Sequence, residues 1–178
     1  MLRLRALWIA ATFGLLLAAG SALAETPAGL TRFAGQYTYS NTRDHGIAVV
    51  EKASEAALAE LNMVMRLLAK KGMADRFAIN ILIEVTPGKV AMKVGSLDKF
   101  AAELNKPTKW TSQDGKQTGM VTYKFEGGKL ISSVTGDEGS VTSTMTLSAD
   151  GKTLQRDVHW MGKRLKKPVS YRLVYKRK

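Results

Sequence analysis

The segment after Arg76 most constrains the fold, because short stretches of alternating apolar and polar residues are separated there by turn signals. A period of two places every second side chain on one face, as in a β-strand with one buried face. The turns carry a glycine that follows proline, an acidic residue or another glycine, as tight hairpins require. We therefore predict an antiparallel meander with strands at 77–85, 89–94, 117–125, 130–135, 141–147, 153–160 and 169–175.

A strand and a helical segment precede this meander. Residues 35–39 alternate like a first strand. From Asp44 onward, apolar residues recur every three or four positions, which indicates a helical insertion over about 44–72 with one buried face. Asp44 is the expected N-cap, Gly72 the expected C-terminal glycine, and a break near Asn62 would make a helical pair. Residues 95–110 are ambiguous between a short helix and a loosely paired strand.

The order of these elements predicts the fold class. A meander of about eight to ten strands usually closes into an up-and-down barrel, because closure removes exposed strand edges. We therefore predict a mainly β protein, an antiparallel up-and-down β-barrel with a helical insertion after the first strand. A β-sandwich is the alternative, but its Greek-key connections need longer crossovers than these short turns provide.

The first 24 residues have the three parts of a cleavable signal peptide. Arg3 and Arg5 precede an apolar run at 6–20, and small residues follow at 21–24. The apolar run is shorter than the roughly 20 residues that cross a bilayer. We expect cleavage before Glu25 and localisation in the periplasm or outside the cell. The rest, 25–178, is long enough for one barrel domain, which lacks cysteine and must be held by its core alone.

The chain is basic, with 27 lysine and arginine residues against 15 acidic residues. Much of the excess lies in a basic C-terminal region, formed by Lys163, Arg164, Lys166, Lys167, Arg172, Lys176, Arg177 and Lys178. In an exported protein, such a region favours anionic membrane surfaces or envelope polymers over nucleic acid. A solvated, charged terminus is the simpler interpretation of the same residues.

Three segments together carry a resemblance to a known superfamily: Gly35-Gln36-Tyr37, the helical insertion, and Leu173-Val174-Tyr175-Lys176-Arg177. They resemble, in turn, the Gly-x-Trp that opens lipocalins, the portal helices of fatty-acid-binding proteins, and the closing strand of the latter. This resemblance to the calycin superfamily implies a lipocalin-like barrel, in a bacterial exported protein, that carries a hydrophobic molecule. Leu173 stands where fatty-acid-binding proteins place the arginine of their Arg-x-Tyr carboxylate clamp, so the inherited anchor is missing there.

The more apolar parity of the strands predicts which side chains face the barrel interior. An interior of this size either fills with its own side chains or encloses one small ligand, and the alternation leaves both open. Adaptable methionines and the polar atoms of tyrosine and tryptophan favour a cavity. The candidate ligand-binding residues are Ile81, Ile83, Met92, Tyr123, Phe125, Met145, Arg156, Trp160, Tyr171 and Tyr175.

Arg156 is anomalous because it shares the inward parity of Leu154 and Val158, and a buried charge needs a partner. Either an acidic ligand supplies that partner, or the strand has barely begun at Arg156 and the side chain reaches solvent at the rim. We favour the rim interpretation. If the barrel is hollow, we expect Arg156 to anchor a carboxylate or phosphate, assisted by Tyr171 or Tyr175.

The sequence contains no recognisable catalytic motif. His45 and His159 are the two histidines, and the chain lacks a nucleophile elbow, a His-Glu-x-x-His pair, a phosphate-binding loop and a dinucleotide fingerprint. We expect a protein that is not an enzyme and that uses no cofactor or metal. The predicted function is an exported carrier of a small hydrophobic or amphipathic ligand, with the helices as a lid. The alternative is a cationic envelope protein with a solid barrel that binds anionic lipid or polymer.

Overall fold

The computed structural model describes residues 26–64, 66–67, 77–112 and 114–178. The expected signal peptide and its cleavage site lie outside the described residues, and so does the expected end of the helical insertion at 68–72. Among the described residues, no helix is long and apolar enough to cross a membrane.

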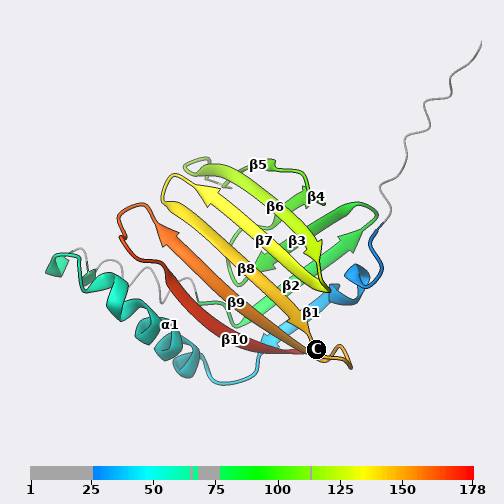
Figure 1. The fold of residues 1–178 in the computed structure, drawn as a ribbon, viewed down its shortest axis with the longest axis horizontal. Coiled ribbons are helices and arrows are strands. Elements are labelled where there is room, and N and C mark those ends of the chain that lie inside the picture. Colours follow the sequence, from blue (N-terminus) through cyan, green and yellow to red (C-terminus); the bar gives the residue numbers. More distant parts are fainter. Residues whose placement is uncertain (1–25, 65, 68–76, 113) are drawn as a thin grey trace, which may run out of the picture.

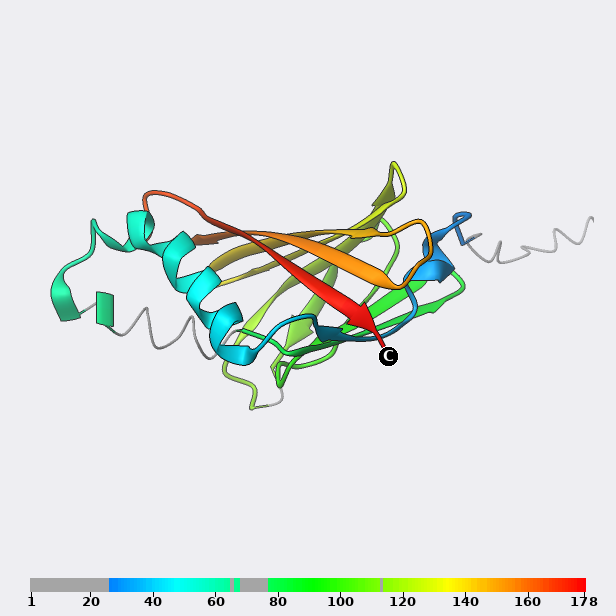
Figure 2. The same ribbon diagram turned by 90° about the horizontal axis from the view of Figure 1, so that it is seen from below.

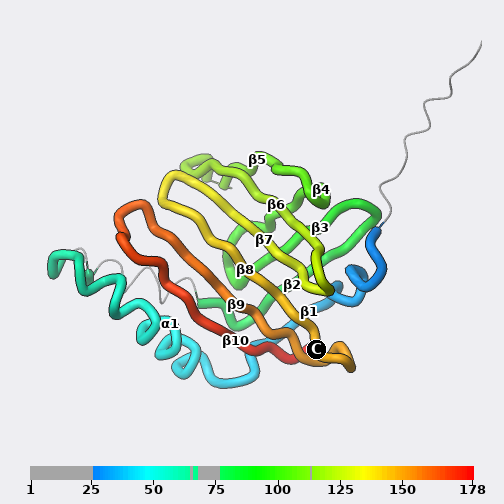
Figure 3. Tube along the Cα trace, in the orientation of Figure 1, coloured from blue at the N-terminus to red at the C-terminus, as the bar shows by residue number. Residues whose placement is uncertain are grey.

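Ten antiparallel strands form one sheet that curves into a nearly closed barrel (Figures 1 and 2). Apart from β4 and β5, each strand pairs with its neighbours in the chain, and β1 also pairs with β10, so the course of the tube in Figure 3 runs around the barrel. A 3-10 turn, η1 (Leu30–Phe33), precedes the barrel, and helix α1 (Arg43–Leu58) lies between the first two strands. The strands are β1 (Gly35–Tyr39), β2 (Asn80–Thr86), β3 (Lys89–Val94), β4 (Phe100–Glu103), β5 (Thr108–Thr111), β6 (Thr118–Glu126), β7 (Lys129–Gly136), β8 (Gly139–Leu147), β9 (Thr153–Gly162) and β10 (Val169–Arg177).

This topology confirms the predicted up-and-down barrel with a helical insertion, and it excludes the sandwich. The predicted strands lie within two or three residues of the observed ones. The largest shift is at β2, which begins at Asn80 because Phe77 and Ala78 pack into the core without joining the sheet. The inward parity is also confirmed, since Ile81 and Ile83 are buried while Leu82 between them is exposed.

The barrel stays open between β4 and β5, the two edge strands. These short strands occupy the segment that was ambiguous in the sequence, so the strand interpretation is confirmed there and the helix interpretation is wrong. Side chains cover the gap. The rings of Phe100 and Trp110 meet edge to face with centroids 5.1 Å apart, and the Tyr123 hydroxyl donates to the Phe100 carbonyl at 2.9 Å. Aromatic packing and one backbone hydrogen bond, from the Asn105 N–H to the Tyr123 carbonyl at 2.7 Å, therefore span the gap.

Helix α1 begins after Thr42, whose hydroxyl accepts the His45 N–H at 3.3 Å. The predicted N-cap, Asp44, is wrong by two residues. Asp44 lies inside the first turn, where its negative charge interacts favourably with the positive end of the helix dipole. The helix ends at Leu58, and residues 63, 64, 66 and 67 are helical again, so the break expected near Asn62 is confirmed. The Arg66 guanidinium donates to the carbonyls of Leu58, Ala59 and Leu61, which satisfies the open end of α1.

A glycine sets how closely α1 approaches the barrel. The helix lies beside β10 at one end of the barrel (Figures 1 and 2), and Phe77 shortly precedes β2 in the chain. A Cβ atom on Gly46 would lie 2.1 Å from Cζ of Phe77, so the ring occupies the space that any other residue would need. This contact places Val50, one turn later, over the interior of the barrel.

We expect Gly46→Ala to lower the free energy of unfolding by about 1–3 kcal/mol, because the added methyl must displace the Phe77 ring. This cost outweighs the gain of about 1 kcal/mol in helix propensity. Urea unfolding followed by circular dichroism measures the change. In a Phe77→Ala background the same substitution should cost nothing, and an equal loss in both backgrounds would contradict the contact.

Arg177 closes the other end of the barrel, next to η1. Its guanidinium donates to the Ala34 carbonyl at 2.7 Å, to the Gly151 carbonyl at 2.9 Å, to the Tyr37 hydroxyl at 2.6 Å and to the Arg32 carbonyl. It also lies 5.0 Å above the centre of the Tyr37 ring, within range of a cation–π interaction. One arginine thus joins η1, β1, β10 and the β8–β9 turn.

Candidate ligand-binding cavity

The half of the barrel nearer α1 encloses a cavity of about 410 Å³. This volume lies within the range of about 300–1,000 Å³ that small-molecule sites occupy. The barrel is therefore hollow there, which resolves the alternative that the sequence left open. Its apolar walls are formed by Val50 of α1 and by Met92, Val94, Leu97, Phe100, Trp110, Val134, Val141, Val158, Trp160 and Val169.

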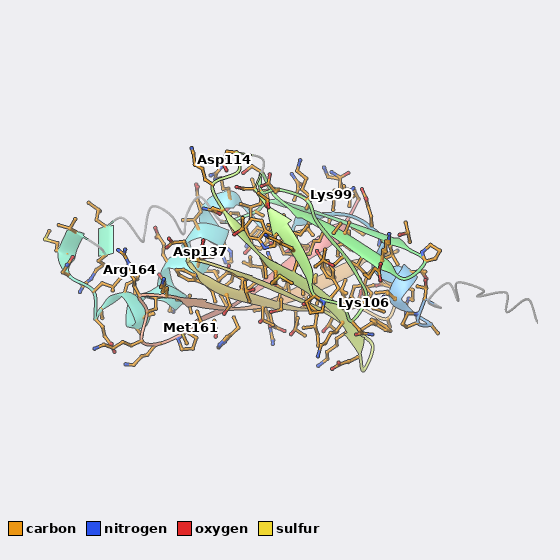
Figure 4. All side chains as sticks on the ribbon, turned by 90° about the horizontal axis from the view of Figure 1, so that it is seen from above. Lys99, Lys106, Asp114, Asp137, Met161 and Arg164 are labelled. Carbon is orange, nitrogen blue, oxygen red and sulfur yellow. The ribbon has the colours of Figure 1, made fainter. Side chains whose placement is uncertain are left out.

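Polar residues line one end of the cavity, which we call its mouth. It is lined by 116–118, which lead into β6, and by 136–139, which form the β7–β8 turn. Asp137, in this turn, and Arg164, in the β9–β10 connection, both lie toward the α1 end of the molecule (Figure 4). The mouth therefore faces the same end of the barrel as the helix.

The floor of the cavity is also polar, in contrast to its walls. On the four strands β7 to β10, the deepest lining residues are Ser132, Ser143, Arg156 and Tyr171. One inward position further from the mouth, all four strands carry apolar residues that are no more than 2% exposed: Leu130, Met145, Leu154 and Leu173. The polar floor therefore rests on the packed half of the barrel.

Arg156 is the charged residue of this floor, with 7% of its surface exposed. Strand β9 begins at Thr153, three residues earlier, so the side chain points inward instead of reaching solvent, and the rim interpretation is wrong. Nε and Nη2 donate to the Ser143 hydroxyl at 3.1 and 2.9 Å. Within the described part of the chain, no carboxylate forms an ion pair with Arg156. The cavity therefore contains a buried positive charge with a neutral partner, which is costly without a counter-ion.

Four of the ten candidate residues line the cavity: Met92, Arg156, Trp160 and Tyr171. The other six fill the barrel around and beneath it: Ile81, Ile83, Tyr123, Phe125, Met145 and Tyr175. The Tyr175 hydroxyl donates its proton to the Ala78 carbonyl at 3.1 Å, and its oxygen lies close to the Arg156 guanidinium. Parity predicts that a side chain points inward, but not how deep it lies, and the role of all ten residues in binding stays a prediction.

The sequence analysis did not identify Ser132 and Ser143. Both lie on inward positions and are nearly fully buried, at 2% and 1% exposure. A signal was present at Ser143, because it shares the parity of Met145, a candidate ligand-binding residue on the same strand. Searching the inward parity for polar residues as well as for charges would have found it.

The basic C-terminal region is partly used within the fold. Lys166 and Lys167 lie 3.7 and 3.1 Å from the Glu60 carboxylate, and a hydrogen bond from Lys167 lowers the pKa of Glu60. Arg172 pairs with Asp157 on the outer face of the sheet, at 2.5 Å. Arg177 is also used within the fold, because it closes one end of the barrel. The basic C-terminal region therefore offers fewer unpaired cations to an anionic partner than its sequence implies.

Burial raises the pKa of four tyrosines in the barrel: Tyr37, Tyr39, Tyr123 and Tyr175. At Tyr37 and Tyr175, the nearby guanidiniums of Arg177 and Arg156 oppose this rise without cancelling it. A buried phenolate would lose its hydration, so these side chains hold their protons in the folded state.

We expect the free energy of unfolding to fall as the pH rises above about 10. In that range the unfolded chain has lost its tyrosine protons while the native state keeps them, so deprotonation favours unfolding. Phenolate absorbance and circular dichroism recorded together over an alkaline titration measure this. Tyrosine ionisation should coincide with loss of β structure, and ionisation of all the tyrosines in a folded barrel would contradict it.

The fold of this chain is similar to that of several solved structures, although its sequence is not similar to that of known families. No family model matches the sequence, and no curated protein sequence matches it. Among solved structures, lipid binding protein 8 of Caenorhabditis elegans has a TM-score of 0.50 at 13% identity, covering 84% of this chain and 97% of that one. A Schistosoma mansoni fatty acid binding protein in complex with arachidonic acid has a TM-score of 0.50 at 11% identity, covering 84% and 98%. A "secretary abundant heat soluble" protein of Ramazzottius varieornatus has a TM-score of 0.53 at 11% identity, covering 83% and 96%. The chain therefore has the calycin-like fold that its sequence motifs resemble.

Proposed function

We propose that this protein is an exported carrier that holds one small hydrophobic or amphipathic molecule inside its barrel, with an acidic group of that molecule at Arg156. The observation that carries the proposal is the cavity itself: a volume of about 410 Å³ with apolar walls and a buried arginine on its floor. Apolar walls favour a hydrocarbon-like body, and the uncompensated guanidinium favours a carboxylate or phosphate.

The solved structures with this fold support a lipid-like ligand. One is named a lipid binding protein, and another is a fatty acid binding protein in complex with arachidonic acid, a carboxylic acid. Helix α1 supports the same proposal as a lid, since its Val50 lines the cavity and the polar mouth lies at the same end. Of the two tyrosines expected to assist Arg156, Tyr171 lines the cavity and is the better candidate.

Native mass spectrometry after mild extraction tests the proposal directly. We expect the protein to carry additional mass of the size of one small lipid, released on organic extraction. A protein that is recovered empty, and that then fails to take up dodecanoic acid, would refute the carrier function. The alternative, a cationic protein that binds anionic envelope surfaces, would instead show salt-sensitive retention of the empty protein on anionic vesicles.

A further inference from the structure

We infer that Ser132 is a second donor to the ligand's head group and determines specificity for an anion with two acceptor oxygens. This inference rests on the proposed carrier function and concerns the same cavity. The site would therefore accept a carboxylate, whose two charged oxygens can accept hydrogen bonds from Ser132 and Arg156 at once. It would discriminate against the corresponding alcohol or ester, because neither carries a negative charge that strengthens these hydrogen bonds.

Ser132 is almost completely buried yet lacks a hydrogen-bond partner. It is 2% exposed and lines the cavity floor, and among the described residues its hydroxyl forms no hydrogen bond. In the described part of the chain, every side-chain nitrogen or oxygen that is fully buried has a hydrogen-bond partner. The Ser132 hydroxyl therefore opens onto the cavity, where a ligand atom can pair with it.

Ser132 lies next to the serine that holds Arg156. Ser132 and Ser143 are directly opposite each other in the β7–β8 ladder, and such pairs have Cβ atoms about 4.5–5.5 Å apart. Ser143 accepts two hydrogen bonds from Arg156, which fixes the orientation of the guanidinium and leaves the Ser143 proton to donate. The floor thus gathers two hydroxyl donors and a guanidinium on adjacent strands. This excess of donors complements an anion with several acceptor oxygens.

The position of this donor cluster differs from the clamp that the resemblance implies. Leu173 occupies the expected arginine position on the closing strand, and Arg156 is its direct partner on β9. The Tyr175 hydroxyl, two residues along, donates its proton to the Ala78 carbonyl, so it has no proton to offer a ligand. The anchoring function therefore moves from β10 to β9, and its second donor comes from β7 instead of from the closing strand.

Binding of three probes to the purified protein and to two variants tests this inference. The probes are dodecanoic acid, methyl dodecanoate and dodecanol, measured by isothermal titration after delipidation. We expect Ser132→Ala to weaken dodecanoic acid about tenfold, the effect of one hydrogen bond to a charged group, and to leave the ester and the alcohol within about twofold. Ser133→Ala is the matched control, since Ser133 is the next residue on β7 and has the opposite parity. It should change none of the three affinities.

The outcomes separate this inference from the proposed function. Selective loss of the acid in Ser132→Ala supports both. An equal change for acid, ester and alcohol would show that Ser132 only shapes the cavity, which overturns the inference and leaves the carrier function standing. If the unaltered protein binds none of the probes, the carrier function fails and the inference fails with it. Thermal unfolding of each variant confirms that binding is compared between folded proteins.

Discussion

Replacing Arg156 with methionine should weaken the binding of dodecanoic acid by about ten- to a hundredfold, the effect of one or more hydrogen bonds to a charged group. The same change should leave the empty barrel at least as stable as before. Arg156 is buried against a neutral hydroxyl, so its removal relieves a desolvation cost while an unbranched apolar side chain of similar length refills the space. Binding is measured by isothermal titration, and stability by urea unfolding of the delipidated protein.

Two comparisons make this result specific to the charge. Methyl dodecanoate should bind the Arg156→Met protein as well as the unaltered one, because the ester presents no negative charge to lose. Arg172→Met removes an arginine from the outer face of the neighbouring strand and should leave both affinities unchanged. Equal losses for the acid and the ester at Arg156→Met, together with lower stability, would show that Arg156 only supports the fold.

Replacing Arg177 with methionine should lower the free energy of unfolding by about 3–5 kcal/mol, the cost of removing a charged group from a partly buried network. The substitution leaves the carbonyls of Ala34, Arg32 and Gly151 without their donor, and it removes the cation above the Tyr37 ring. The midpoint of urea unfolding should fall accordingly while the cavity, at the other end of the barrel, remains intact.

The matched control is Lys176→Met, which changes an exposed cation one residue away and should alter stability by less than about 0.5 kcal/mol. Arg177→Lys should recover little of the loss, because a single ammonium group cannot reach three carbonyls on two separate segments in the way that a planar guanidinium does. A stable Arg177→Met protein, or full recovery by lysine, would mean that the barrel end is closed by other contacts.

Local sequence signals determined most of the architecture. Alternation with a period of two identified nearly every strand, and glycine at the turns set the hairpins, because both are properties of a few consecutive residues. The same reasoning placed Arg156 on an inward position, where the structure has it. Local reasoning failed at the N-cap of α1. Thr42 and Asp44 are both good capping residues, and the sequence does not show at which of them the helix begins.

The same local signals did not show how deep each inward side chain lies along the barrel axis. Tyr175 and Tyr171 share one parity on one strand, yet Tyr171 lines the cavity while Tyr175 lies beneath it and bonds to Ala78. The predicted strand begins at 153, as β9 does, so the start of the strand did not decide whether Arg156 lies at the rim or on the floor. The packing of the neighbouring strands decided it, because their side chains leave Arg156 only 7% exposed.

The sequence by itself thus determined that this chain forms an antiparallel barrel with a helical insertion, and which side chains face its interior. Only the tertiary structure decided that the interior is packed at the Arg177 end and hollow at the α1 end, and that Ser132, Ser143 and Arg156 meet on one floor. The physical reason is that alternation fixes the direction of a side chain relative to its own strand. A cavity is instead the volume left after side chains from many strands and α1 have packed, so it depends on all of them at once.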